Sequence, residues 1–303
     1  MKYWQEEQNR AAFEYAKAAT AANSKSFYIS AKMLPREKRW ATFALYGFCR
    51  FVDNLIDNPR DRSEFEILQE INYFENELHI AYRKGESEHP VIRSFILVAK
   101  KYNIPIEYPL DLIEGVKMDM GLIRYKTFDD LYLFCYRVAS VVGLMMTHVM
   151  GYRDKAAFKY AEKLGIAMQL TNILRDIKED KDNDRIYLPH DELEKFGISD
   201  WHIFNEKFTT KFKDMMQFQV KRAAQYYEEA YPGIEMLSRD SQFAIYSASK
   251  IYRGILGKVE AQNYNPFSGR VFVPKSKKLA ILFKELFRTK ILTTEGEFAP
   301  ANS

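Results

Sequence analysis

Apolar residues recur three and four positions apart along nearly the whole chain, and no alternating run is long enough to form a strand. Glycine and proline are scarce, at 13 and 10 of 303 residues, which argues against a turn-rich β-sandwich or barrel. No linker rich in glycine, serine or proline divides the chain. The sequence therefore predicts an all-α fold in a single domain over residues 1–303. The spacing predicts helices at residues 4–22, 36–57, 62–84, 90–102, 107–121, 128–150, 154–180, 207–230, 240–263 and 275–289.

The charged residues are nearly balanced, 45 basic against 41 acidic, and they form no basic face of the kind that binds nucleic acid. The two cysteines, Cys49 and Cys135, lie far apart in apolar surroundings, as expected of free thiols in a reducing compartment. The longest uncharged apolar stretch, 138–152, is shorter than the roughly 20 residues of a membrane span. We expect a cytoplasmic protein that is soluble or peripheral at the inner membrane surface.

A single polar stripe interrupts the predicted helix at 36–57. Tyr46, Arg50, Asp53 and Asp57 are spaced four, three and four residues apart, so they share one helix face among apolar neighbours. Burying two unpaired carboxylates costs several kcal/mol each. Arg50 alone does not neutralise both, so the pattern predicts that another cation faces this stripe.

A second stripe of the same design lies 123 positions further along the chain. Gln169, Asn172, Asp176 and Asp180 again share one face of an otherwise apolar helix. A lone pair of aspartates four residues apart is weak evidence, because charged helix faces are commonly solvated. The apolar setting of both stripes favours two functional surfaces that face each other across a cavity.

Carboxylate and amide oxygens on two facing helices suit Mg²⁺, with Mn²⁺ as a substitute. Zinc would require histidine or cysteine ligands, and the five histidines show no ligand spacing. Mg²⁺ usually completes its coordination with water and substrate phosphate, and the chain has neither a P-loop nor a dinucleotide-binding glycine motif. The inferred substrate is a diphosphate held through the metal, Arg50 and Arg175.

Aromatic residues make up 15% of the chain, a high share for a soluble domain. An aromatic-walled apolar cavity can hold a long hydrocarbon and stabilise a carbocation through its ring faces. Any single ring is better explained as core packing. Tyr136 and Tyr252 stand out because their helical segments also carry polar positions.

Five stretches resemble the squalene/phytoene synthase family of head-to-head prenyl synthases. They are SKSFYISAKMLP (24–35), ALYGFCRFVDNLID (44–57), CYRVASVVG (135–143), LGIAMQLTNILRDIKEDKDNDRIYLP (164–189) and IYRGILGKVEAQNYNPFSGRVFVPKSKKL (251–279). Their order and separation also fit, so the resemblance covers about residues 20–288. It implies the isoprenoid-synthase helical bundle around a central cavity.

The resemblance also implies roles for individual residues. The Mg²⁺ ligands would be Asp53, Asp57, Asn172, Asp176 and Asp180. The substrate contacts would be Ser24, Lys25, Ser26, Tyr46, Arg50, Gln169, Arg175, Tyr252 and Arg270. Tyr136 would line the reaction centre, and the catalytic group would comprise Tyr46, Arg50, Asp53, Asp57, Tyr136, Asp176 and Asp180.

The implied reaction is Mg²⁺-dependent 1–1′ condensation of two prenyl diphosphates through a cyclopropylcarbinyl diphosphate. The segments IYRGILGKVEAQNY and DRIYLP favour two C20 geranylgeranyl diphosphates and phytoene as the product, without NADPH. One alternative is the condensation of two C15 farnesyl diphosphates to dehydrosqualene, or to squalene if NADPH supplies hydride. A different class, an inactive lipid-binding or assembly-factor relative, should have lost motif aspartates, and this chain retains all four.

The segment 270–290 carries seven basic residues and one acidic residue. Leu279, Leu282, Phe283 and Leu286 form an apolar helix face with lysines around it. This face either docks on the protein core or contacts a membrane surface. The oligomeric state stays open at the level of sequence.

Overall fold

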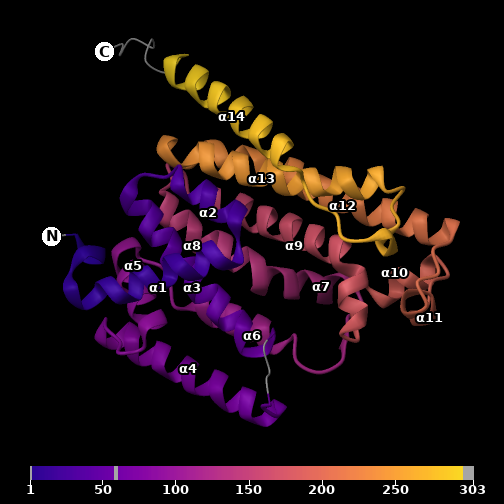
Figure 1. Ribbon diagram of the computed structural model, residues 1–303, viewed down its shortest axis with the longest axis horizontal. Helices are drawn as coiled ribbons and strands as arrows, with labels where there is room; N and C mark the ends of the chain where they lie inside the picture. Colours follow the sequence, from indigo (N-terminus) through magenta and orange to yellow (C-terminus); the bar gives the residue numbers. More distant parts are fainter. Residues whose placement is uncertain (1, 58–60, 296–303) are drawn as a thin grey trace.

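Helices dominate the computed structural model (Figure 1). It describes the backbone of residues 2–57 and 61–295. Within these ranges it describes the side chains of all residues except Lys25, Ser26 and 287–295. The α-helices are α1 (Glu7–Asn23), α2 (Lys25–Lys32), α3 (Arg36–Asp57), α4 (Glu64–Lys84), α5 (Pro90–Tyr102), α6 (Glu107–Lys117), α7 (Phe128–Cys135), α8 (Val141–Met150), α9 (Ala157–Asp182), α10 (His190–Lys195), α11 (Asp200–Phe204), α12 (Thr210–Glu235), α13 (Arg239–Ala261) and α14 (Lys275–Glu295). Two-residue strands β1 (Ile123–Arg124) and β2 (Arg185–Ile186) form the sheet in this part of the chain. The predicted all-α fold is confirmed.

The helix boundaries follow the hydrophobic spacing closely where a helix is long. α3 and α5 begin and end where the periodicity predicts, whereas the predicted helix 128–150 consists of α7, a π-helical turn (Tyr136–Ser140) and α8. The sequence analysis missed α2 as a separate helix. Ser24 separates it from α1 because its backbone leaves the helical region, at φ −145° and ψ 88°.

α9 is the central helix, and it packs against α8, α12, α13 and the π-helical turn. Glycines make these approaches close. A Cβ on Gly165 would lie 2.4 Å from the Cα of Ser140, and a Cβ on Gly233 would lie 2.1 Å from the Cβ of Tyr160. Any side chain at either glycine would therefore push two helices apart.

The buried side chains form two hydrophobic clusters. One is centred on α3, α5 and neighbouring helices and contains Phe48 and Phe95, whose rings stack with centroids 4.1 Å apart. The other joins α7, α9 and α12 and contains Phe212 and Tyr227. Tyr136 packs against both clusters. The single-domain organisation over 1–303 stays a prediction, and this shared contact supports it.

The parallel pairing of β1 with β2 joins two distant loops. Ile123 lies opposite Arg185, so the segment after α6 is held against the segment after α9. This pairing matters for the site described below, because it places Asp119 beside the end of α9.

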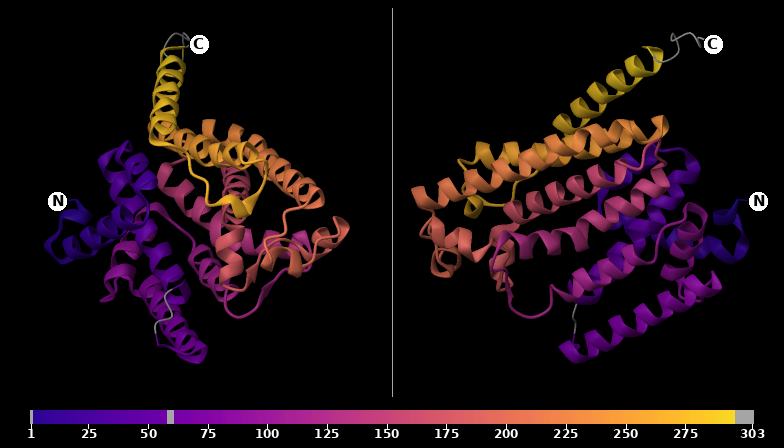
Figure 2. Two further views of the ribbon diagram at one scale, coloured as in Figure 1. Left: turned by 45° about the vertical axis from the view of Figure 1, so that its right-hand side comes forward. Right: turned by 180° about the vertical axis from the view of Figure 1, so that it is seen from behind.

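α14 projects from the body of the molecule beyond α13, as two further views show (Figure 2). It packs against α13, yet Leu279 and Phe283 remain 55% and 62% exposed. The apolar face predicted for this helix is therefore only partly covered. Separately, the stretch Phe128–Met150 is long and apolar enough to span a membrane, but half of it is buried inside the protein, as in an ordinary core helix.

Candidate active site

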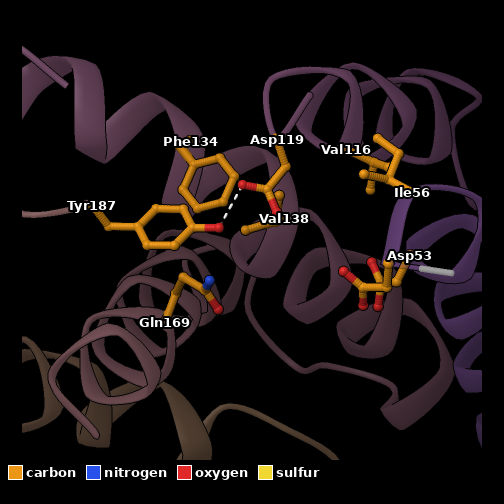
Figure 3. Close-up of a pocket in the computed structure, with 9 residues that line it drawn as sticks. Asp53, Ile56, Val116, Asp119, Phe134, Val138, Gln169 and Tyr187 are labelled. Carbon is orange, nitrogen blue, oxygen red and sulfur yellow. Dashed lines mark hydrogen bonds between the residues drawn. The ribbon is translucent and has the colours of Figure 1, made fainter. Parts of the chain in front are cut away.

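Most residues of the two polar stripes predicted from sequence line a pair of adjoining cavities, but Asp176 and Asp180 are in the lining of neither. The smaller cavity encloses about 180 Å³, with α3 contributing Asp53 and Asp57 to its wall and α9 contributing Gln169. Figure 3 shows Asp53 on one side and Gln169 with Tyr187 on the other. The larger cavity encloses about 640 Å³ and shares Asp53 and Gln169 with the smaller one. The smaller cavity, which we call the acidic chamber because Asp53, Asp57 and Asp119 line it, thus adjoins the larger cavity.

On α9 the lining of the larger cavity changes from mainly apolar between Ala157 and Met168 to polar at Gln169, Asn172 and Arg175. The polar residues that line the whole cavity are Asn23, Ser24, Ser30, Tyr46, Arg50, Asp53, Thr147, Tyr160, Gln169, Asn172, Arg175, Ser249, Tyr252 and Arg270. Aliphatic side chains such as Met150, Leu164 and Ile245 line much of the remainder. A molecule with an anionic head and a hydrocarbon tail matches this distribution of side chains.

On α3, Arg50 and the two aspartates lie on one face. The Nη1 atom of Arg50 is 3.5 Å from Oδ2 of Asp57. Burial, together with the neighbouring Asp57, raises the pKa of Asp53 to about 7, against the opposing effect of Arg50. Within the described residues, Nε of Arg50 is a buried donor that lacks a hydrogen-bond partner. A partly exposed guanidinium whose buried Nε is an unused donor fits an anionic ligand.

On α9, two arginines hold Asp176. Nε of Arg175 donates to Oδ1 of Asp176 at 2.8 Å, and Nε of Arg270 lies 3.0 Å from the same oxygen. Burial and then the Asp176 carboxylate raise the pKa of Asp180 to about 8. The second stripe therefore combines one carboxylate paired with arginine and one that burial disfavours in its charged form.

Asn172 provides a further indication that the site binds a cation. Its Nδ2 donates to Oε1 of Gln169 at 3.2 Å, while its buried Oδ1 has no hydrogen-bond partner among the residues that the structure describes. This unused amide oxygen, on a residue one helical turn from Asp176, is a ligand atom of the kind that Mg²⁺ prefers. In the same part of the chain, no three His, Cys, Asp or Glu side chains are already grouped closely enough to enclose an ion. The oxygen set fits a metal that the substrate also helps to bind.

Sequence reasoning missed one wall of the acidic chamber. Asp119 follows α6 and lines the smaller cavity, where the hydroxyl of Tyr187 donates to its Oδ1 at 2.5 Å (Figure 3). Nη1 of Arg185 is 3.2 Å from Oδ2 of Asp119 and 4.0 Å from Oδ1 of Asp57. Arg185 and Tyr187 belong to the quoted segment DRIYLP, which was the available signal, whereas Asp119 carries none in the sequence.

Of the remaining predicted site residues, some line a cavity and others do not. Ser24, Tyr46 and Tyr252 line the larger cavity, and the ring of Tyr46 stacks on Phe27 with centroids 5.0 Å apart. The side chains of Lys25 and Ser26 lie outside the described residues. Tyr136 is in the lining of neither cavity. Burial raises the pKa of its hydroxyl, and the nearby carboxylates of Asp111 and Glu162 add to this effect. From the same helical stretch, Phe134 and Val138 line the chamber instead.

The chain is similar to known proteins over most of its length. The sequence matches the squalene/phytoene synthase family over residues 20–277. It is 37% identical over 294 residues to 15-cis-phytoene synthase from Synechococcus elongatus, covering 93% of this chain and 94% of that protein. It is 35% identical over 293 residues to 15-cis-phytoene synthase from Synechocystis sp., covering 93% of this chain and 86% of that protein.

A solved structure of a dehydrosqualene synthase in complex with ligand superposes with a TM-score of 0.86 at 30% identity, covering 95% of this chain and 99% of that one. This likeness confirms the predicted isoprenoid-synthase fold. The family match and the level of identity settle the assignment. The chain belongs to the squalene/phytoene synthase family of prenyltransferases, which act on prenyl diphosphates.

Proposed function

We propose that this protein condenses two geranylgeranyl diphosphates head to head to give phytoene, in a reaction that depends on Mg²⁺. The observation that carries the proposal is the acidic chamber joined to a 640 Å³ cavity that is lined by Arg50, Asp53 and Arg175 and, along the rest of α9, by mainly apolar side chains. The 37% identity to a 15-cis-phytoene synthase supports the C20 substrate. The structural likeness to a dehydrosqualene synthase keeps two C15 farnesyl diphosphates as the second candidate.

The proposed metal ligands are Asp53, Asp57, Asn172, Asp176 and Asp180, and a bound Mg²⁺ would stabilise the negative charge of the departing diphosphate. Arg50 and Arg175 bind and orient that diphosphate through guanidinium groups that already line the cavity. Tyr46 and Tyr252, also in the lining, would contact the substrate, and a ring face turned to the allylic cation would stabilise it.

The apolar walls of the larger cavity also contribute to the proposed reaction. They exclude water, which would otherwise quench the cation as an alcohol. The double bond of the second substrate then attacks the cation, and loss of a proton closes the cyclopropane ring. A second ionisation and rearrangement joins the chains 1–1′, and loss of a final proton to the released diphosphate yields an unreduced product without NADPH.

Product analysis tests this proposal. The protein is incubated with labelled C15 and C20 diphosphates, with and without Mg²⁺ and NADPH. We expect phytoene from the C20 substrate only when Mg²⁺ is present, and no effect of NADPH. A C30 product from the C15 substrate alone would establish the second candidate. No metal-dependent product from either substrate would instead identify an inactive relative that binds lipid or assists assembly.

The raised pKa values of Asp53, about 7, and Asp180, about 8, predict a pH-dependent affinity for metal. Both carboxyls are largely protonated at pH 6, and a cation binds only their charged forms. The Kd for Mg²⁺ alone, measured by calorimetry, should therefore fall at least about tenfold between pH 6 and pH 8. An affinity that does not change over this range would contradict the metal assignment.

The raised pKa values of Asp53 and Asp180 also predict how the free energy of unfolding changes with pH. Without metal, the folded protein retains protons that the unfolded chain loses near the ordinary aspartate pKa of 3.8. The free energy of unfolding should therefore decrease as the pH rises from about 4 towards 8. Addition of Mg²⁺ at pH 8 should restore it, as urea titrations with and without the metal would show.

We also propose that α14 holds the enzyme at the inner membrane surface, so that the protein is cytoplasmic and peripheral. Two observations support this proposal. Leu279 and Phe283 are largely exposed, and Lys275, Lys277, Lys278 and Lys284 lie on the same helix. An apolar face flanked by lysines attracts both acyl chains and anionic headgroups.

Vesicle co-sedimentation tests this membrane contact. The double variant Leu279→Asp/Phe283→Asp should bind vesicles containing phosphatidylglycerol at least about tenfold more weakly, because two apolar side chains are lost from the contact. The matched control is Phe65→Asp/Tyr73→Asp on α4, where both residues are as exposed, at 69% and 65%. Equal binding by the α14 variant and the wild type would refute the proposal.

A further inference from the structure

We propose that Ala161 on α9 sets the length of the prenyl chain that the enzyme accepts, because its methyl group leaves the far part of the cavity open to the last isoprene unit of a C20 substrate. This inference rests on the proposed function. It names a specificity-determining position that lies far from the aspartates, arginines and tyrosines of the polar end.

α9 lines the larger cavity over most of its length, so positions along this helix correspond to depths in the cavity. The residues that it contributes to the lining are Ala157, Tyr160, Ala161, Leu164, Gly165, Met168, Gln169, Asn172 and Arg175. They follow the three- and four-residue spacing of one helix face, so the cavity runs along the helix axis. Each residue on this face therefore marks a depth below the polar end.

These depths can be compared with substrate lengths. At a rise of 1.5 Å per residue, Ala161 lies about 17 Å below Asn172, and Ala157 lies about 22 Å below it. Main-chain bonds of an extended chain span roughly 1.2 Å each, so the sixteen-carbon main chain of geranylgeranyl reaches about 19 Å and the twelve-carbon chain of farnesyl about 14 Å. With C1 placed level with Asn172, the C20 chain passes Ala161 and ends above Ala157, while the C15 chain ends before Ala161.

The wall behind Ala161 cannot move back to make room. Gly143 on α8 is so close that a Cβ on it would lie 3.0 Å from the carbonyl oxygen of Ala161. One turn further along α9, Gly165 lies against the backbone of Ser140. Because α9 is already in close contact with α8 at Gly143 and with the π-helical turn at Gly165, a larger side chain at 161 would extend into the cavity.

The far end of the cavity is also fixed. Tyr152 and Leu237 form an antiparallel bridge, and the amide of Ser238 donates to the carbonyl of Gly151 at 2.9 Å. Lys38 donates to the carbonyl of Met150 at 2.6 Å. Met150 and Leu237 both line the cavity at this end. The turn after α8 and the turn after α12 are thereby held together, so the deep end does not simply widen when the wall changes.

The test compares substrate preference in three variants of the full chain. Ala161→Phe should lower kcat/KM for the C20 diphosphate relative to the C15 diphosphate by at least about a hundredfold, since even one misfitting methylene changes specificity by tenfold or more. Ala161→Leu, a smaller change, should shift the ratio in the same direction. Ala161→Ser, which keeps the side chain small, should retain the wild-type ratio.

The outcomes separate the inference from the proposed function. If the wild type condenses the C20 substrate and folded Ala161→Phe and Ala161→Leu keep its preference, the role of Ala161 is refuted while the function stands. If the wild type converts neither diphosphate, the proposed function fails regardless of the variants. Melting curves of each variant identify any that fails to fold, and the Leu and Ser variants then decide the question.

Discussion

Replacing Asp176 by asparagine is expected to reduce turnover by about three orders of magnitude while leaving the helix content unchanged. The substitution keeps the shape of the side chain but removes the negative charge that Arg175 and Arg270 contact in this structure. It would leave these guanidinium groups without their carboxylate and deprive the metal of an anionic ligand, so both the metal and the diphosphate would lose their orientation. Asp53→Asn on the opposite wall should have an effect of similar size.

Steady-state rates over a series of Mg²⁺ concentrations, with circular dichroism of each variant, provide the measurement. The matched control is Asp182→Asn at the end of α9, where the carboxylate is 62% exposed and paired with Lys181. It should retain nearly the full rate. Wild-type turnover in the Asp176 or Asp53 variant would show that these carboxylates do not hold the metal.

Replacing Gly165 by alanine is expected to lower the free energy of unfolding by about 3 kcal/mol, because overpacking at a close backbone contact forces two elements apart. The new Cβ would lie 2.4 Å from the Cα and 2.6 Å from the amide nitrogen of Ser140. These are backbone atoms of the π-helical turn, so no side-chain rotation can relieve the clash. Urea unfolding followed by circular dichroism measures the change.

Gly257→Ala on α13 is the control for the effect of alanine on a helix. A Cβ at this position meets nothing within 4 Å, so the substitution should stabilise the protein by about 0.5–1 kcal/mol through its higher helix propensity. Gly165→Ala as stable as the wild type would mean that α9 and the π-helical turn are further apart than the structure indicates.

The polar stripes were predictable because they are local features. Helical spacing alone places Asp53 with Arg50, and Asp176 with Asn172, on single faces. In the structure Asp53, Arg50 and Asn172 line the cavities, whereas Asp176 is paired with Arg175 and Arg270 and lines neither. Apolar neighbours on the other sides of each helix also predict burial, since a helix that is apolar on most of its surface packs inside the protein. The functional roles of these side chains stay proposals that the variants above test.

Other parts of the site depend on contacts between distant segments. Asp119 enters the chamber because β1 pairs with β2 and holds the loop after α6 beside Arg185 and Tyr187. No local pattern marks this aspartate. Tyr136 opens a π-helical turn, whose extra residue per turn changes the direction of the side chains from that of a regular helix. Phe134 and Val138, on either side of Tyr136, line the chamber instead.

Hydrophobic periodicity and motif order were enough to predict the all-α class, the two acidic helix faces and the family, because they can be read from short stretches of the chain. The loops that complete the acidic chamber, the depth of the cavity along α9 and the small side chains in its wall depend on the packing of distant segments. Cavity shape follows from how closely helices approach, and glycine contacts between residues far apart in the chain set that distance.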